Sequence, residues 1–170
     1  EMIIELRRLL ERSGVAFQSR NDGELLAWLT ARAYDETGSM PAALRSLRST
    51  VRGAYSAVLL FQRRVFATRD VLGFRPLSTA RLPNGGHIVA SETIAFDILG
   101  ADLRSYQEVP AGAILEFAGG DAVIHDPGWE AVTPCKFEQV YFSRPDSQVF
   151  GLPCSLVRRR IGWQLAWESR

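Results

Sequence analysis

In the first fifty residues, apolar side chains recur every three to four positions, which is the period of an amphipathic helix. The pattern predicts a helix that begins near Ile3 and a short strand over Val15–Gln18. Asn21 and Glu24 have the spacing of a capping box, so a second helix is expected to begin there. A third helix follows, with Pro41 at its first position.

From Gly53 onward the pattern changes to strands. Ala54–Phe61 is apolar nearly throughout, as expected of a strand that is covered on both faces. Shorter strands and one short helix alternate with polar turns, and this arrangement predicts an α+β fold built in layers. The expected strands are Val65–Arg69, Arg75–Leu77, His87–Ala90, Ala113–Phe117 and Ala122–His125, and the helix is Glu92–Leu99.

The last forty residues differ in character from the rest of the chain. Trp129–Pro153 is irregular and holds three prolines, which predicts a linker or a strap that docks on the domain. Ser155–Trp167 returns to a helical pattern. Its basic run, Arg158–Arg160, is expected to be solvated or to face a partner.

Composition narrows the class of protein. The chain has 170 residues, 46% of them hydrophobic, which suits one globular domain. A net charge of +1 gives no reason to expect nucleic acid or a membrane as a partner. Cys135 and Cys154 are the only cysteines in the sequence, so we do not expect a disulfide scaffold. We expect a cytoplasmic location, where thiols stay reduced.

Three ionisable residues gather around Gly73 in the stretch Ala67–Leu77. Arg69, Asp70 and Arg75 are close in sequence and flank one turn. Such a cluster could be an anion-binding or acid/base site, or an ion-paired corner that holds two strands in register. Charged turns are more often scaffold, but the residues themselves leave both readings open.

Several longer motifs, each different from the others, are spread along nearly the whole chain. They are Glu5–Arg7, Asp22–Glu24, Arg52–Tyr55, Arg69–Leu77, Val89–Ala95, Val109–Gly112, Cys135–Ser147 and Arg158–Ala166. In this order they resemble the glutamine amidotransferase domain of the amidophosphoribosyltransferase family. The Arg69–Leu77 motif is also similar to asparagine synthetases and other class II amidotransferases, whereas Cys135–Ser147 points to the phosphoribosyl enzymes.

The resemblance implies an N-terminal-nucleophile hydrolase fold, a four-layer αββα sandwich with antiparallel sheets. Residues 1–128 would be part of the glutamine amidotransferase domain, and residues 129–170 a strap and the start of a phosphoribosyltransferase domain. In such enzymes an N-terminal cysteine attacks the side-chain amide of glutamine. The released ammonia reacts with phosphoribosyl pyrophosphate, with Mg²⁺ present, to give 5-phosphoribosylamine in the first step of de novo purine biosynthesis.

Two residues carry over from the family as site candidates. Asp22 matches the aspartate that binds the α-ammonium group of glutamine; the alternative is that it only caps its helix. Cys135 matches a cysteine that is a [4Fe–4S] ligand in some members, and the alternative is a buried, inert thiol. The implied partners are glutamine, the chain's own phosphoribosyltransferase domain and further copies in a homo-oligomer.

The remaining catalytic groups are expected to lie outside the chain. Position 1 is Glu1, so the nucleophilic cysteine and the oxyanion-stabilising Asn-Gly pair would precede it, and the chain alone is expected to be an inactive fragment with no catalytic residue of its own. Two alternatives stay open. The chain could be a non-catalytic remnant that binds glutamine or another protein, or it could belong to a different class II amidotransferase, similar to asparagine synthetase.

Overall fold

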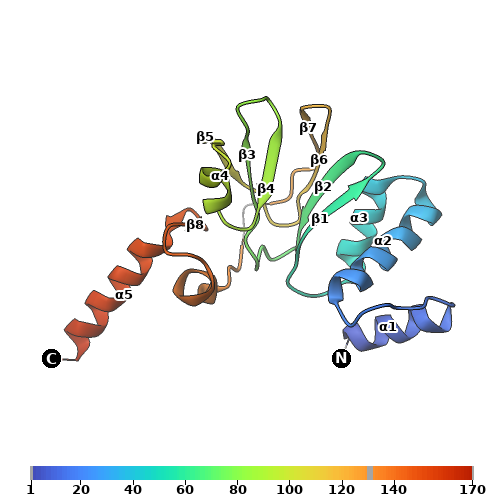
Figure 1. The fold of residues 1–170 in the computed structure, drawn as a ribbon. Coiled ribbons are helices and arrows are strands. Elements are labelled where there is room, and N and C mark those ends of the chain that lie inside the picture. The colour runs from blue at the N-terminus through green and yellow to red at the C-terminus, as the bar shows by residue number, and fades with distance from the viewer. Residues whose placement is uncertain (1, 130–131, 170) are drawn as a thin grey trace. The chain divides into compact units, whose positions relative to one another are not determined.

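A computed structural model describes residues 2–129 and 132–169, and the chain divides into two compact units, Glu1–Gly53 and Ala54–Arg170 (Figure 1). Glu1 lies outside the described residues, as do Glu130 and Ala131 of the predicted strap. The predicted domain boundary after residue 128 remains a prediction, because the compact units divide at a different place.

The first unit consists of three helices, α1 (Met2–Arg12), α2 (Asp22–Thr37) and α3 (Met40–Thr50). All three were expected from the apolar periodicity. Helices α2 and α3 pack together through buried leucines and alanines, and a left-handed Gly38 ends α2 so that α3 can begin two residues later (Figure 1). The predicted strand over Val15–Gln18 is wrong, because that segment is an irregular loop.

The second unit contains two antiparallel sheets. In the larger sheet the order is β1-β2-β6-β7, and in the smaller it is β4-β3-β5. A short helix, α4, connects the strands β4 and β5. The bounds are β1 (Ser56–Phe61), β2 (Arg64–Arg69), β3 (Ser78–Arg81), β4 (His87–Ala90), α4 (Ile94–Ile98), β5 (Asp102–Glu108), β6 (Ile114–Ala118) and β7 (Asp121–Asp126).

The core of this unit lies between the two sheets. Ala67 of β2 and Leu115 of β6 face it from the larger sheet, and Val89 of β4 packs against them from the smaller one. Leu77 and Val109 close the core at the strand ends. This pair of facing antiparallel sheets with helices confirms the predicted α+β class.

Two strand predictions need correction. β1 is an edge strand, and its Val58 and Leu60 side chains are 52% and 77% exposed, so it is not covered on both faces. The predicted strand over Arg75–Leu77 is wrong, because β3 begins at Ser78 after an irregular segment. β5 had no counterpart in the sequence prediction.

The predicted strap contains short elements. A π-helix, η1 (Glu138–Phe142), is followed by the two-residue strands β8 (Gln148–Val149) and β9 (Leu152–Pro153). Helix α5 (Cys154–Glu168) then confirms the expected C-terminal helix. Among the described residues, no helix is long and apolar enough to cross a membrane.

Candidate functional site

Asp22 is the first residue of α2, but it does not cap the helix. The cap is Asn21, whose side-chain Oδ1 accepts a hydrogen bond from the backbone N–H of Gly23 at 2.7 Å. The Asp22 side chain is exposed, and within residues 2–129 and 132–169 it makes no hydrogen bond or ion pair. Because Asn21 performs the capping role, the helix does not require Asp22 for it.

Glu24 fixes the loop that leads into α2. Its carboxylate accepts hydrogen bonds from the backbone N–H groups of Gln18 and Ser19, both at 2.7 Å, and from the Ser19 hydroxyl at 2.6 Å. The hydrogen bond from the Ser19 hydroxyl is the main reason that the pKa of Glu24 is lowered. The capping-box spacing therefore located the helix start correctly, but Glu24 binds the preceding loop and not the N–H of Asn21.

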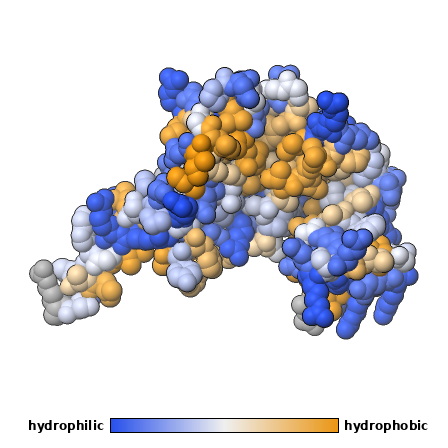
Figure 2. Space-filling model, viewed as in Figure 1, coloured by the Kyte–Doolittle hydropathy of each residue, from blue (hydrophilic) through white to orange (hydrophobic). Residues whose placement is uncertain are grey.

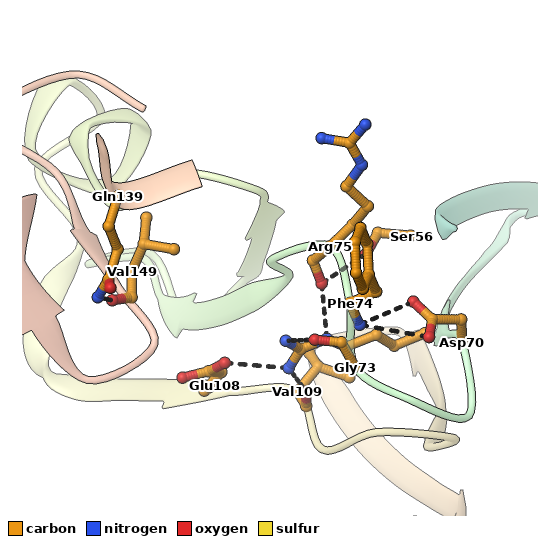
Figure 3. A network of polar contacts seen from close by, with 10 residues as sticks. Ser56, Asp70, Gly73, Phe74, Arg75, Glu108, Val109, Gln139 and Val149 are labelled. Atoms are coloured by element: carbon orange, nitrogen blue, oxygen red, sulfur yellow. Dashed lines mark hydrogen bonds and ion pairs between the residues drawn. The ribbon is translucent and has the colours of Figure 1, made fainter. Parts of the chain in front are cut away.

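Asp70 holds the turn after β2 through backbone hydrogen bonds. It is fully buried, and its carboxylate accepts from the N–H group of Phe74 at 3.1 Å (Figure 3). It also accepts from the N–H groups of Leu72 at 2.8 Å and Tyr55 at 3.3 Å. A buried carboxylate that is fully engaged by the backbone has no lone pair directed at a substrate. Asp70 is therefore a structural residue.

Arg69 is buried beside this turn and is satisfied mainly by carbonyl oxygens. Its guanidinium donates to the carbonyls of Arg75 at 2.7 Å and Gly73 at 2.8 Å, and it forms an ion pair with Glu108 at 3.0 Å. These contacts join the turn to the end of β5. Gly73 has φ +57°, and an added Cβ would lie 3.1 Å from the Cβ of Ala111, so the turn requires glycine here.

The side chain of Arg75 does not contact Asp70 or the guanidinium of Arg69. Its side chain points away from Asp70 (Figure 3) and pairs with Glu138 of η1, and this hydrogen bond raises the pKa of Arg75. Its guanidinium also lies 5.6 Å from the ring centre of Phe142. The three charged residues therefore do not form one acid/base or anion site, and the cluster is scaffold.

Motif residues bind the strap to the segment before α4 within the second unit. The carboxylate of Glu92 accepts from the N–H of Arg144 at 2.7 Å and the hydroxyl of Ser147 at 2.9 Å. The hydroxyl of Thr93 accepts from the N–H of Gln148 at 2.8 Å. Two motifs that are about fifty residues apart in the sequence thus form one hydrogen-bonded contact.

Arg158 corrects the expectation of a solvated basic run. Its guanidinium donates to the carbonyls of Gln139 at 2.9 Å and Ser143 at 2.5 Å, which are carbonyls at η1 and at its C-terminal end. Arg159 and Arg160 are exposed, as expected. Arg158 therefore fastens α5 to the π-helix.

The two cysteines do not complete a metal site among the described residues. Cys135 is half-buried, Cys154 is fully buried, and burial raises the pKa of the Cys154 thiol. Within residues 2–129 and 132–169 no group of three or more His, Cys, Asp or Glu side chains could hold a metal. A [4Fe–4S] cluster needs four thiolates, so the part of the chain that is described cannot hold one unaided.

Comparison with known proteins relates this geometry to a family. Residues 3–97 match the family model described as a glutamine amidotransferase domain. The chain is 38% identical to an amidophosphoribosyltransferase of Methanothermobacter thermautotrophicus, over 97% of this chain and 34% of that protein. It is 32% identical to the amidophosphoribosyltransferase of Bacillus subtilis, again over 97% of this chain and 34% of that protein.

Solved structures agree with the sequence relatives. Glutamine phosphoribosylpyrophosphate amidotransferase from B. subtilis, complexed with ADP and GMP, superposes with a TM-score of 0.85 and 31% identity, covering 97% of this chain and 35% of that one. The chain spans about a third of the length of the relatives that it matches. The similarity confirms the predicted N-terminal-nucleophile hydrolase fold class and the resemblance drawn from the motifs.

Proposed function

Because this chain belongs to the glutamine amidotransferase domain family, we propose that it supplies the glutamine-handling part of an amidophosphoribosyltransferase. Such an enzyme hydrolyses glutamine to glutamate and ammonia. The ammonia then displaces pyrophosphate from phosphoribosyl pyrophosphate, and 5-phosphoribosylamine is formed. In this proposal Asp22 binds the α-ammonium group of glutamine.

One observation carries the choice of enzyme within the wider family. The domain model ends at residue 97, yet the similarity to amidophosphoribosyltransferases covers 97% of the chain. The strap, which follows the matched residues 3–97, is also hydrogen-bonded to them. The carboxylate of Glu92 accepts from the N–H of Arg144 and from the hydroxyl of Ser147. An asparagine synthetase-like protein would account for the domain but not for this strap.

The surroundings of Asp22 suit a ligand for ammonium. A zwitterionic substrate needs a fixed carboxylate for its positive group. Asp22 stands in the first turn of a helix, where the helix dipole favours negative charge, and its carboxylate is exposed with no protein partner within the described residues. This combination supports the ligand role over a purely structural one.

The family also suggests what accompanies the chain in the whole protein. The proposal includes a phosphoribosyltransferase domain that binds Mg²⁺, a homo-oligomeric assembly and a location in the cytoplasm. Cys135 would be one thiolate of a [4Fe–4S] cluster only if three further cysteines of the longer protein approach it. Iron and sulfide content of the purified whole protein, with Cys135→Ser as the comparison, tests that part separately.

The central experiment measures pyrophosphate release from phosphoribosyl pyrophosphate by the full-length protein that carries this chain. We expect release with either glutamine or ammonium chloride as the nitrogen donor. Release with neither donor would refute the proposal. Release with ammonia alone, in a protein whose glutamine site is intact in sequence, would favour the non-catalytic alternative for this chain.

Asp22→Asn tests the assigned residue in the same assay. Removing one charged hydrogen-bond partner should lower kcat/KM for glutamine about 10- to 100-fold, while the ammonia-supported rate stays unchanged. A polypeptide of residues 1–170 serves as a negative control. Its only thiols, Cys135 and Cys154, are internal and lack the free α-amine that accepts the proton in this mechanism, so it should release no ammonia from glutamine.

A further inference from the structure

Two charged residues hold the loop before α2, and the proposed function gives neither of them a role. Arg7 of α1 donates from its guanidinium to the backbone carbonyl of Ser19, and it lies 4.0 Å from the ring centre of Phe17. Glu24 of α2 accepts from the N–H and the hydroxyl of Ser19. Ser19 is therefore bound from α1 on its carbonyl side and from α2 on its amide side.

The hydrogen bonds continue from Ser19 to the start of the helix. The hydroxyl of Ser19 accepts from the N–H of Asn21 at 3.2 Å, and the side chain of Asn21 accepts from the N–H of Gly23. Asp22 lies between these two anchored residues. Its backbone is thus fixed on both sides, although its carboxylate makes no contact of its own within the described residues.

This arrangement matters for a binding residue more than for the helix. The cap on α2 is already complete through Asn21, so a second set of bonds to the loop is not needed to begin the helix. A carboxylate that must meet a substrate ammonium, however, loses much of its effect when it is displaced by about 1 Å. The contacts of Arg7 and Glu24 restrict that displacement.

We propose that Arg7 and Glu24 are positioning residues that hold the loop of residues 15–21 so that Asp22 is presented to the ammonium group of glutamine. This inference rests on the proposed function of Asp22. Neither residue touches the substrate in this proposal. They act through Ser19 and Asn21.

The test uses Arg7→Ala and Glu24→Ala in the full-length protein. Each should raise the KM for glutamine about tenfold, with kcat within about twofold and the ammonia-supported rate unchanged. Arg8→Ala is the matched control for Arg7→Ala, and Glu36→Ala is the matched control for Glu24→Ala. Each control removes the same charge from the same helix at an exposed position. The controls should keep the KM for glutamine within about twofold. Arg7→Lys, which can still donate to the Ser19 carbonyl, should restore most of the affinity.

The outcomes separate the two proposals. If Asp22→Asn leaves the KM for glutamine unchanged, the assignment of Asp22 itself fails. If Asp22→Asn raises the KM but Arg7→Ala and Glu24→Ala only lower the melting temperature, the positioning role is refuted while the proposed function stands. If either alanine variant does not fold, Ser19→Ala decides the matter, since it removes only the hydroxyl from the chain of hydrogen bonds. An unchanged KM in Ser19→Ala would then count against the proposal, and a KM raised about threefold would support it.

Discussion

Asp70 shows how a charged motif residue serves the fold. Its carboxylate has no exposed surface, and its partners are the backbone N–H groups of Leu72 and Phe74 in the turn and of Tyr55, which precedes β1. A buried carboxylate is tolerated when it is fully hydrogen-bonded, and it then fixes the backbone around it. The motif from Ala67 to Leu77 is therefore the corner that joins β2 to the route into β3.

Asp70→Ala should destabilise the second unit severely. The substitution leaves the buried N–H of Tyr55 and the part-buried N–H groups of Leu72 and Phe74 without their acceptor. We expect a loss of about 3–5 kcal/mol in the free energy of unfolding, measured by urea denaturation. Asp97→Ala, at an exposed position of α4, is the control and should change stability by less than about 0.5 kcal/mol. Loss of glutamine affinity with unchanged melting would contradict the structural role.

Glu116 is a second buried carboxylate, on β6. His125 Nε2 lies 2.6 Å from one of its oxygens, and Arg64 lies 3.2 Å from the other. Burial alone would raise the pKa of Glu116, but the hydrogen bonds with His125 and Arg64 outweigh it, so the pKa is lowered. Its ionised form is therefore favoured in the folded state.

A lowered carboxylate pKa makes stability depend on acid pH. The contribution of Glu116 is fully present above the pKa of about 4.3 that a glutamate has in an unfolded chain, and it is lost as the pH falls through the lower folded value. Unfolding free energies measured between pH 3 and pH 7 should therefore fall less steeply at the acid end in Glu116→Gln than in the unsubstituted chain. Asp97→Asn should leave that slope unchanged. Identical slopes in all three proteins would show that Glu116 makes no such contribution.

At the level of elements, apolar periodicity predicted the amphipathic helices. The helices α1, α2, α3 and α5 were found because their apolar positions repeat at helical spacing. β5 was missed because its sequence, DLRSYQE, is mostly polar, as suits an edge strand whose first residues are exposed. Val15–Gln18 has the apolar pattern of a strand, but none of the described strands pairs with it, and the loop is held by side chains from α1 and α2 instead.

The strap shows why some contacts are beyond reach from one sequence. Arg75 and Glu138 are 63 positions apart, and Glu92 and Ser147 are 55 apart. No local pattern signals such pairs, because they depend on how the strap packs against the segments that precede β3 and α4. A family resemblance locates the motifs but does not say which motif binds which.

The β1–β2 hairpin carries local strain that can be removed. Its two-residue turn consists of Gln62 and Arg63, with φ +47° and +65°, a left-handed conformation that favours Asn-Gly. Arg63→Gly should raise the free energy of unfolding by about 1 kcal/mol, as read from thermal or urea unfolding. Arg63→Ala keeps a Cβ and should give no gain. Equal stability of the glycine and alanine variants would mean that the turn is not strained.

For the whole molecule, the sequence offered a candidate for the site and the structure describes its surroundings. Resemblance proposed Asp22, but only the structure shows that Asn21 takes the capping role and that the Asp22 carboxylate is left without a partner within the described residues. Those facts depend on side-chain directions at a helix start, which spacing does not determine. The same holds for Arg7, whose contact with Ser19 spans two helices and a loop.

The described surface also carries exposed apolar residues that suit association. Figure 2 shows apolar surface gathered around α4 and, separately, over the β1–β2 hairpin. On the edge strand β1, Leu60 is 77% exposed, and its register through Val65 to Phe117 places it on the sheet face that elsewhere forms the core. A core-type face on an unpaired edge favours pairing with another chain.

We therefore expect the 170-residue chain to self-associate, and Leu60→Lys to reduce that association. A lysine on β1 leaves the strand intact but adds a charge that must be desolvated when a second chain pairs there. Sedimentation at several protein concentrations measures the effect, which should appear as a lower average mass at the highest concentration. Leu72→Lys is the matched control, since Leu72 is also exposed but lies in a turn with no strand edge to offer. A monomer at all concentrations in the unsubstituted chain, or equal association of both variants, would show that the β1 edge is not the contact.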